Sequence, residues 1–248
     1  MTEVAFDKYG AKGAYHWVEY FGPVHRINAY TRARYDAIVR VLQANGIGPA
    51  SRVLDVGCGD AALAGLIAMR LGAGVDGIDT TPMSIELART EFKRRRLKGE
   101  FRLIDSYEYP FEPGTFDAVV CSDVIEHVNK PDTMLREMWR VLKPGGVLAI
   151  TTPIRTTEQP LDPNHVQEWF ADEFRRLCED ALDVRVELRA SHAVAFADLY
   201  AAPNTLGRIS RLSMNVLTKL GYNVFSRTTG FRVWSTQMVV AKRSFPSL

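Results

Sequence analysis

The sequence predicts an α/β fold built on a mostly parallel β-sheet, and three observations support this prediction. From about residue 50, short apolar runs alternate with helical patterns, which is typical of a parallel sheet with helices between its strands. The first apolar run ends in a glycine turn at 57–59. The 248 residues, of which 46% are hydrophobic, are enough to bury one core. We therefore expect residues 1–248 to form a single domain.

Seven apolar runs bounded by turn residues are expected to be strands. They lie at 53–56, 74–79, 101–105, 116–122, 146–152, 184–188 and 234–240. Helices are expected at 61–71, from Pro82 to about Arg95, around 135–142 and at 171–179. Thr81 followed by Pro82 is a typical helix start, and the third helix has apolar residues at i, i+3, i+4 and i+7. The Lys-Pro-Gly-Gly run at 143–146 predicts the end of that helix.

Two segments lie outside this alternation. Residues 1–50 are expected to form a helical, aromatic cap on the cofactor-binding core at 51–192, and residues 193–230 a helical lid inserted before the last strand and tail at 231–248. In the insert, a helix is expected to have an apolar face and an opposite basic face. The apolar face comprises Leu206, Ile209, Val216 and Leu220, and the basic face Arg208, Arg211, Asn215 and Lys219. Such a helix either packs on its own domain or makes transient contact with a membrane surface.

Charge and cysteine content exclude several classes of protein. The 31 Lys and Arg residues against 29 Asp and Glu residues leave a net charge of +2, so no global field favours a nucleic-acid partner. Cys58, Cys121 and Cys178 form no C-x-x-C pair, which argues against a disulfide framework and a structural zinc site. The first residues lack the apolar core of a signal peptide, and no apolar run is long enough to span a bilayer. We expect a cytoplasmic protein.

The glycine turn and two acidic residues predict a nucleotide-like cofactor. Asp55 precedes Gly57 and Gly59, and Asp79 ends the next strand, where its carboxylate can bind both hydroxyls of a ribose. The pattern Gly57-x-Gly59-x-x-Ala62 also fits a dinucleotide fingerprint. However, Asp55 would repel a pyrophosphate, whereas it could accept a hydrogen bond from an ammonium. S-adenosylmethionine has that ammonium and no phosphate, so the pattern favours this methyl donor over NAD.

The ordered motifs resemble the class I S-adenosylmethionine-dependent methyltransferase superfamily. They are VLDVGCGDA, GIDTTPMSIELAR, LIDS, FDAVVCSDVIEHV and LREMWRVLKPGGVLAITTP, between about Val53 and Pro153. The resemblance implies a Rossmann-like, seven-stranded sheet with helices on both faces and an antiparallel last strand. It further implies that Asp55, Gly57, Cys58 and Gly59 hold the methionine end, that Asp79 and Thr80 contact the ribose, that Asp105 and Ser106 flank the adenine, and that Ser122 and Asp123 lie near the sulfonium. Ala61 stands where the family often has a third glycine.

A polar turn after the fourth strand is the candidate for acting on the acceptor. Asp123-x-x-Glu126-His127 is expected on one helical face, and His165 follows the fifth strand at the same edge of the sheet. This arrangement is similar to that of ubiquinone-pathway O-methyltransferases and of small-RNA 3′-terminal 2′-O-methyltransferases, although the first glutamate of their E-x-x-E-H turn is Asp123 here. The resemblance implies catalytic Glu126, His127 and His165 that bind Mg²⁺, Mn²⁺ or Zn²⁺. The alternative is that His127 acts as a base without metal.

The N-terminal aromatic residues Tyr15, His16 and Trp17 are candidates for contacting the acceptor, or else pack on the sheet edge. Together these features predict O-methylation of a hydroxyl on a small molecule such as a sugar, a quinol or a secondary metabolite. Methylation of nitrogen or carbon is the nearest alternative. A module that binds S-adenosylmethionine without turnover is an alternative from a different class.

Overall fold

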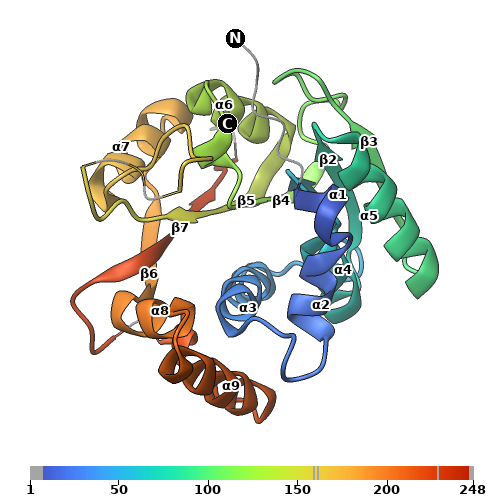
Figure 1. The fold of residues 1–248 in the computed structure, drawn as a ribbon. Helices are drawn as coiled ribbons and strands as arrows, with labels where there is room; N and C mark the ends of the chain where they lie inside the picture. The colour runs from blue at the N-terminus through green and yellow to red at the C-terminus, as the bar shows by residue number, and fades with distance from the viewer. Residues whose placement is uncertain (1–7, 159, 161, 228, 246–248) are drawn as a thin grey trace.

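The structure is a computed structural model that describes residues 8–158, 160, 162–227 and 229–245. Its centre is a seven-stranded sheet in the order β3-β2-β1-β4-β5-β7-β6 (Figure 1). The strands are β1 Arg52–Val56, β2 Gly74–Asp79, β3 Gly99–Leu103, β4 Phe116–Ser122, β5 Leu142–Pro153, β6 Glu187–Ala193 and β7 Trp234–Lys242. Strands β1 to β5 pair in parallel, and β7 is antiparallel to both β5 and β6. The predicted Rossmann-like, mostly parallel sheet with an antiparallel last strand is confirmed.

Helices cover both faces of this sheet (Figure 1). They are α1 Lys8–Lys12, α2 Tyr15–Phe21, α3 Ala29–Ala44, α4 Ala62–Leu71, α5 Pro82–Arg95, α6 Pro131–Val141, α7 Ala171–Leu182, α8 Val194–Ala201 and α9 Thr205–Lys219, with 3₁₀ turns η1 Ile125–His127 and η2 Val224–Ser226. In β1, Val53 packs with α2 to α5, and Leu54 with α6 and α7. Successive side chains of a strand point to opposite faces, so a continuous apolar run needs cover on both sides.

The largest differences between predicted and observed strand boundaries are in β5 and β6, and they arise because the partner strand decides them. Strand β3 is also shifted, to 99–103 from the predicted 101–105. Strand β6 starts at Glu187 rather than at 184, since its pairing with β7 runs from Glu187 opposite Val240 to Ala193 opposite Trp234. Strand β5 already includes the Lys-Pro-Gly-Gly run that was expected to be a turn. There Gly145 has a φ of 81° and donates its N–H to Arg243 O at 2.6 Å. Bonds to the extension of β7 thus keep these glycines in the sheet.

The insert forms two helices that are attached to the start of α3. Tyr200 of α8, Met214 of α9 and Phe225 of η2 pack with Ala29 and Ala33 of α3 in a small cluster separate from the two main cores. The predicted amphipathic helix α9 is present. Of its expected basic side, Asn215 is only 2% exposed and faces inward, whereas Arg208 and Lys219 are exposed. Within the described residues, no helix has the length and apolarity needed to cross a membrane.

Candidate active site

The loop after β1 brings backbone, rather than side chains, to the carboxyl edge of the sheet. Gly57 and Gly59 have φ values of 69° and 53°, and Gly57 N and Cys58 N donate to Ile78 O at 2.8 and 3.0 Å. A Cβ at Gly57 would collide with the Val124 side chain. Only glycine fits this left-handed and crowded position, which places the loop directly beside the turn that follows β4.

Ala61 also has left-handed backbone, with a φ of 59°. A residue with a Cβ adopts this conformation at a cost of about 1–2 kcal/mol. The requirement explains why a glycine often stands here in the resembling proteins. Ala61 N donates to Cys58 O at 2.8 Å, and Ala61 forms the N-cap of α4. The loop therefore keeps its turn geometry with alanine at this position.

Asp79 joins the loops after β1 and β2. Its carboxylate accepts hydrogen bonds from Gly59 N at 2.9 Å and from Thr81 N at 2.8 Å, and burial raises the pKa of this carboxyl group. Thr80 beside it is exposed. The structure thus brings Asp79 and the glycine turn together, as a ribose site at the ends of adjacent strands requires. Asp105 and Ser106 follow β3, next to β2, and both are exposed.

Asp55 lies beneath the glycine loop and is 2% exposed. Its Oδ2 atom has no hydrogen-bond partner among the described residues. Burial, with smaller contributions from Asp79 and Asp60, raises the pKa of Asp55 to about 8. The carboxyl group therefore holds its proton at neutral pH until a cation approaches.

This protonation state predicts that cofactor binding releases a proton. The ammonium of S-adenosylhomocysteine near Asp55 would lower its pKa, so that at about pH 6.5 roughly one proton leaves for each molecule bound. Because the bound form is the deprotonated one, affinity should rise by up to about tenfold per pH unit until the pH approaches the pKa of the ligand-free carboxyl. Calorimetry in phosphate and in Tris, which differ in ionisation enthalpy, measures the release. Proton release that persists in Asp55→Asn would contradict the assignment.

The N-terminal aromatic residues converge on the same loop. His16 N donates to Asp60 Oδ2 at 2.9 Å, and Trp17 Nε1 donates to Asp60 O at 2.7 Å. Trp17 is 2% exposed and its ring lies against Gly65 of α4, whereas the side chain of His16 is 19% exposed. Trp17 is therefore a core residue here, and Tyr15 and His16 remain the candidates for contacting an acceptor.

Sequence reasoning missed two residues in this region, Tyr9 and Asp60. The Tyr9 hydroxyl touches the space where Gly59 would carry a Cβ, and burial raises the pKa of Tyr9 well above its ordinary value. Asp60 is 1% exposed and anchors the N-terminal helices through the two bonds from His16 and Trp17. The sequence feature that could have identified Asp60 was its position directly after Gly59.

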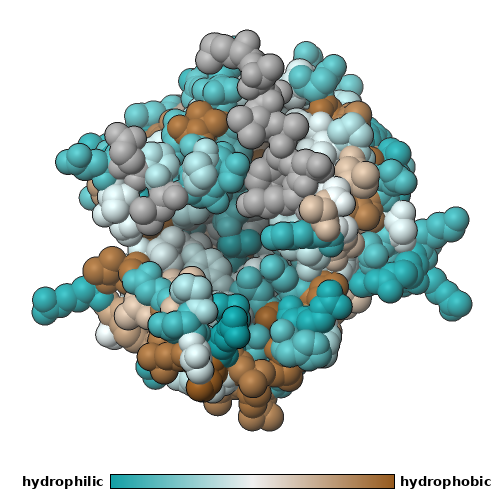
Figure 2. Space-filling model, viewed as in Figure 1, coloured by the Kyte–Doolittle hydropathy of each residue, from teal (hydrophilic) through white to brown (hydrophobic). Residues whose placement is uncertain are grey.

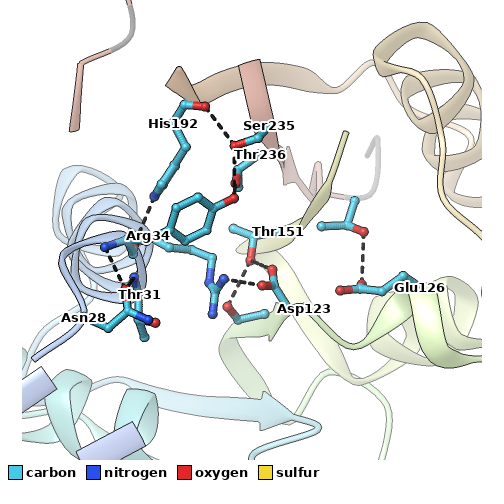
Figure 3. Close-up of polar contacts among 12 residues, drawn as sticks. Asn28, Thr31, Arg34, Asp123, Glu126, Thr151, His192, Ser235 and Thr236 are labelled. Atoms are coloured by element: carbon cyan, nitrogen blue, oxygen red, sulfur yellow. Dashed lines mark hydrogen bonds and ion pairs between the residues drawn. The ribbon is translucent and has the colours of Figure 1, made fainter. Parts of the chain in front are cut away.

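Asp123 does not join Glu126 and His127 in the candidate metal group, contrary to the prediction that the three share one helical face. It has left-handed backbone, with a φ of 53°, and forms an ion pair with Arg34 of α3 (Figure 3). Thr151 Oγ1 donates to Asp123 Oδ1 at 3.3 Å and lies 2.9 Å from Ser122 Oγ. The reason lies in the backbone. The helical turn η1 comprises only residues 125–127, so Asp123 lies outside it, and the Asp123 side chain is paired with Arg34 of α3.

Glu126, His127 and His165 do come together. One potential ligand atom from each lies within 4.8 Å of the others. Glu126 O accepts from Val166 N at 2.9 Å and from Gln167 N at 3.2 Å, so the backbone of the loop after β5 is bound to η1. The predicted triad therefore forms through main-chain bonds between two distant segments.

Hydrogen bonds orient each member of this triad. His127 Nδ1 donates to Asn164 O at 2.9 Å, and His165 Nδ1 donates to Glu168 Oε1 at 2.5 Å. Each bond places the ring lone pair on Nε2, which is the tautomer that metal-binding histidines adopt when a carbonyl or carboxylate holds their other nitrogen. Glu168, which is 6% exposed, was not predicted from the sequence. The sequence feature that could have identified Glu168 was its spacing of three residues from His165.

Glu126 itself is buried and only half satisfied. Thr152 Oγ1 donates to its Oε2 at 3.0 Å, whereas Oε1 has no hydrogen-bond partner among the described residues. Burial, followed by the nearby charge of Asp123, raises the pKa of Glu126 well above its ordinary value. A buried carboxyl oxygen without a partner is costly, and a bound cation or hydrogen-bond donor would satisfy it.

Comparison with known proteins agrees with the fold and shows the family of the chain. A family model described as a methyltransferase domain matches residues 54–150. The chain belongs to the class I S-adenosylmethionine-dependent methyltransferase superfamily. It is 30% identical over 234 residues to a ubiquinone biosynthesis O-methyltransferase of Chromobacterium violaceum, which covers 92% of this chain and 90% of that protein.

Two further proteins illustrate the range of this similarity. A ubiquinone biosynthesis O-methyltransferase of Xanthomonas campestris pv. campestris (strain B100) is 36% identical over 155 residues, and the chain spans 62% of its length. The structure of Haemonchus contortus phosphoethanolamine N-methyltransferase 2 with phosphomonomethylethanolamine and S-adenosylhomocysteine superposes with a TM-score of 0.67 at 17% identity, covering 98% of this chain and 60% of that one. At this identity, the structural match shows the shared fold.

Proposed function

We propose that this methyltransferase methylates a hydroxyl group of a small molecule that carries two adjacent hydroxyls, such as a quinol or catechol. The triad of Glu126, His127 and His165 is the observation that carries the proposal. A hydroxyl must lose its proton before it attacks a methyl group, and this step requires a base or a cation near the acceptor. The names of the relatives from Chromobacterium and Xanthomonas support transfer to oxygen.

The chemistry of the triad fits a divalent cation. Two Nε2 lone pairs and the unsatisfied Oε1 of Glu126 would hold it. Mixed imidazole and carboxylate donors suit Mn²⁺ and Zn²⁺, whereas Mg²⁺ prefers oxygen donors alone. When bound, such a cation lowers the pKa of a coordinated hydroxyl and stabilises its negative charge.

The surrounding residues would keep this site in shape. Thr152 holds one oxygen of Glu126, and Glu168 fixes the ring of His165. Transfer also needs the acceptor oxygen at roughly 3–3.5 Å from the methyl carbon and in line with the carbon–sulfur bond. Ser122 ends β4 and Asp123 follows it, next to Val124, whose side chain lies against Gly57 of the glycine loop. This position suits both residues to the sulfonium side of this line.

A chelation experiment with paired acceptors tests the proposal. The protein is treated with EDTA and assayed for S-adenosylhomocysteine release with 3,4-dihydroxybenzoate, and with 4-hydroxybenzoate as the match that lacks the adjacent hydroxyl. We expect turnover with the catechol and not with 4-hydroxybenzoate. Chelation should lower this turnover by about 10²-fold or more, and Mn²⁺ or Zn²⁺ should restore it better than Mg²⁺. Calorimetric titration with Mn²⁺ should show one site in the wild type and a strongly weakened site in Glu126→Gln. Unchanged turnover after chelation, or equal Mn²⁺ binding by Glu126→Gln, would contradict metal assistance.

A further inference from the structure

Helix α9 exposes an apolar face to solvent, in which Ser213 is the polar residue. Figure 2 shows hydrophobic residues gathered at the bottom of the molecule, where Figure 1 places α9. The exposed apolar side chains on and directly after this helix are Leu206, Ile209, Leu212, Val216, Leu217 and Leu220, with exposed fractions between 40% and 78%. Their helical spacing places them on one side. A cluster of six exposed apolar side chains on one side of a helix usually marks a contact site.

Polar bonds hold α9 in the orientation that exposes this face. Asn215 donates to Val24 O at 3.0 Å and to Ile27 O at 2.8 Å, and it accepts from the Tyr200 hydroxyl at 2.7 Å. Arg211 Nε donates to Tyr200 O at 2.9 Å. Because these partners are all on the inner side, the helix cannot rotate its leucines inward without breaking buried hydrogen bonds.

The charges of α9 and of the segment that follows it have one sign, and the acidic residue nearest to them in the chain is Asp198, which is exposed on α8. All 29 acidic residues of the chain precede residue 199, whereas seven of the 31 basic residues follow it. Arg208 and Lys219 are exposed and flank the apolar face on α9, and Arg227 and Arg232 are exposed in the segment that follows. Apolar side chains bordered by cations, with no acidic residue among them, complement a surface that is apolar inside and anionic outside.

We propose that α9 docks this enzyme onto an anionic lipid bilayer, with its leucine face in the interfacial layer and Arg208 and Lys219 at the headgroups. This inference goes beyond the proposed reaction, because it rests on α9 alone. A second copy of the chain fits this face less well, since a symmetric contact would bring the same cations toward each other. The bilayer supplies both the apolar layer and the negative charge.

Docking through α9 would also orient the site toward the membrane. The Tyr200 hydroxyl accepts from Ala29 N at 3.0 Å at the start of α3, and the same helix carries Arg34, which is paired with Asp123. Tyr30 lies in α3 between Ala29 and Arg34, and its hydroxyl shares a 2.5 Å hydrogen bond with the Oγ1 atom of Thr236 in β7. The insert, α3 and the carboxyl edge of the sheet are therefore one connected body, and a lipid-dissolved acceptor would enter beside it.

Vesicle flotation tests the docking. Vesicles of phosphatidylcholine alone are compared with vesicles that contain about 30% phosphatidylglycerol, using the wild type, Ile209→Gln/Leu212→Gln and Arg208→Ala/Lys219→Ala. We expect the wild type to float with anionic vesicles and to be released by salt. The apolar double variant should bind on the order of tenfold more weakly, and each removed cation should cost about fivefold.

Met69→Gln on α4 is the matched control, because Met69 is an exposed apolar residue far from α9 in the chain and should leave vesicle binding unchanged. Thermal melting and S-adenosylhomocysteine titration verify that every variant is folded, since all altered side chains are exposed. Wild-type protein that does not float with anionic vesicles would overturn the proposal. A concentration-dependent dimer in sedimentation velocity that Ile209→Gln/Leu212→Gln abolishes, without vesicle binding, would assign the face to a second copy instead.

Discussion

Replacing His127 with alanine is expected to lower turnover by about 10²–10⁴-fold while the affinity for S-adenosylhomocysteine stays unchanged. His127 belongs to the triad and not to the glycine loop, and its Nδ1 bond to Asn164 O makes Nε2 the nitrogen that would bind a metal or accept a proton. The change therefore removes the group that activates the acceptor and leaves the cofactor contacts intact. Turnover of 3,4-dihydroxybenzoate and calorimetric titration with S-adenosylhomocysteine measure the two effects separately.

Two further variants make this result interpretable. His25→Ala removes an exposed histidine outside the site and should keep wild-type turnover. His165→Ala separates the two roles considered for His127: with a shared metal, both histidines are needed, whereas a lone base at His127 would tolerate loss of His165. Full activity of His127→Ala would refute a catalytic role for the triad, and full activity of His165→Ala would leave His127 as the base.

Replacing Asp79 with asparagine is expected to weaken S-adenosylhomocysteine binding by about 30- to 150-fold, equivalent to about 2–3 kcal/mol, because one of the two hydrogen bonds to the ribose hydroxyls is lost and the other is no longer charge-assisted. Asparagine keeps the shape of the side chain and can still accept one of the bonds from Gly59 N and Thr81 N, so the loops should stay in place. Because burial already raises the pKa of Asp79, removal of its charge should cost little stability. Calorimetry and thermal melting measure affinity and stability.

Asp76→Asn is the matched control for this prediction. Asp76 lies in the same strand, is 6% exposed, and accepts from Arg52 Nε at 2.8 Å away from the carboxyl edge of the sheet. Its substitution should lower the melting temperature through the lost ion pair and leave cofactor affinity unchanged. Wild-type affinity in Asp79→Asn, or an equal loss of affinity in Asp76→Asn, would show that Asp79 does not bind the ribose.

The cofactor end was predictable because its signals are local. Gly57 and Gly59 are needed for a left-handed turn, and Asp79 ends the strand that lies beside β1 in any right-handed crossover. The alternation of apolar runs and helices predicts parallel strands, and the carboxyl ends of parallel strands lie at the same edge of the sheet. Each signal is local to one strand and the turn that follows it, and the two strands are consecutive in the chain.

The acceptor end required the tertiary structure. Arg34 and Asp123 are 89 residues apart in the chain and meet only because the fold packs α3 against β5, beside the turn that follows β4 (Figure 3). Asp123 was expected beside Glu126 from helical spacing, but its left-handed backbone turns it toward Arg34. Glu168 likewise acquires its role when main-chain bonds join its loop to η1.

The sequence by itself determined the α/β fold, the glycine turn with its two acidic partners, and the membership of Glu126, His127 and His165 in one candidate site. The tertiary structure decided the ends of β5 and β6, the pairing of Asp123, and the side of α9 that faces solvent. The physical reason is the same in each case. Periodicity and backbone preference act between neighbours in the chain, whereas strand register and buried polar pairs are settled by whichever distant groups the completed packing places within hydrogen-bonding distance.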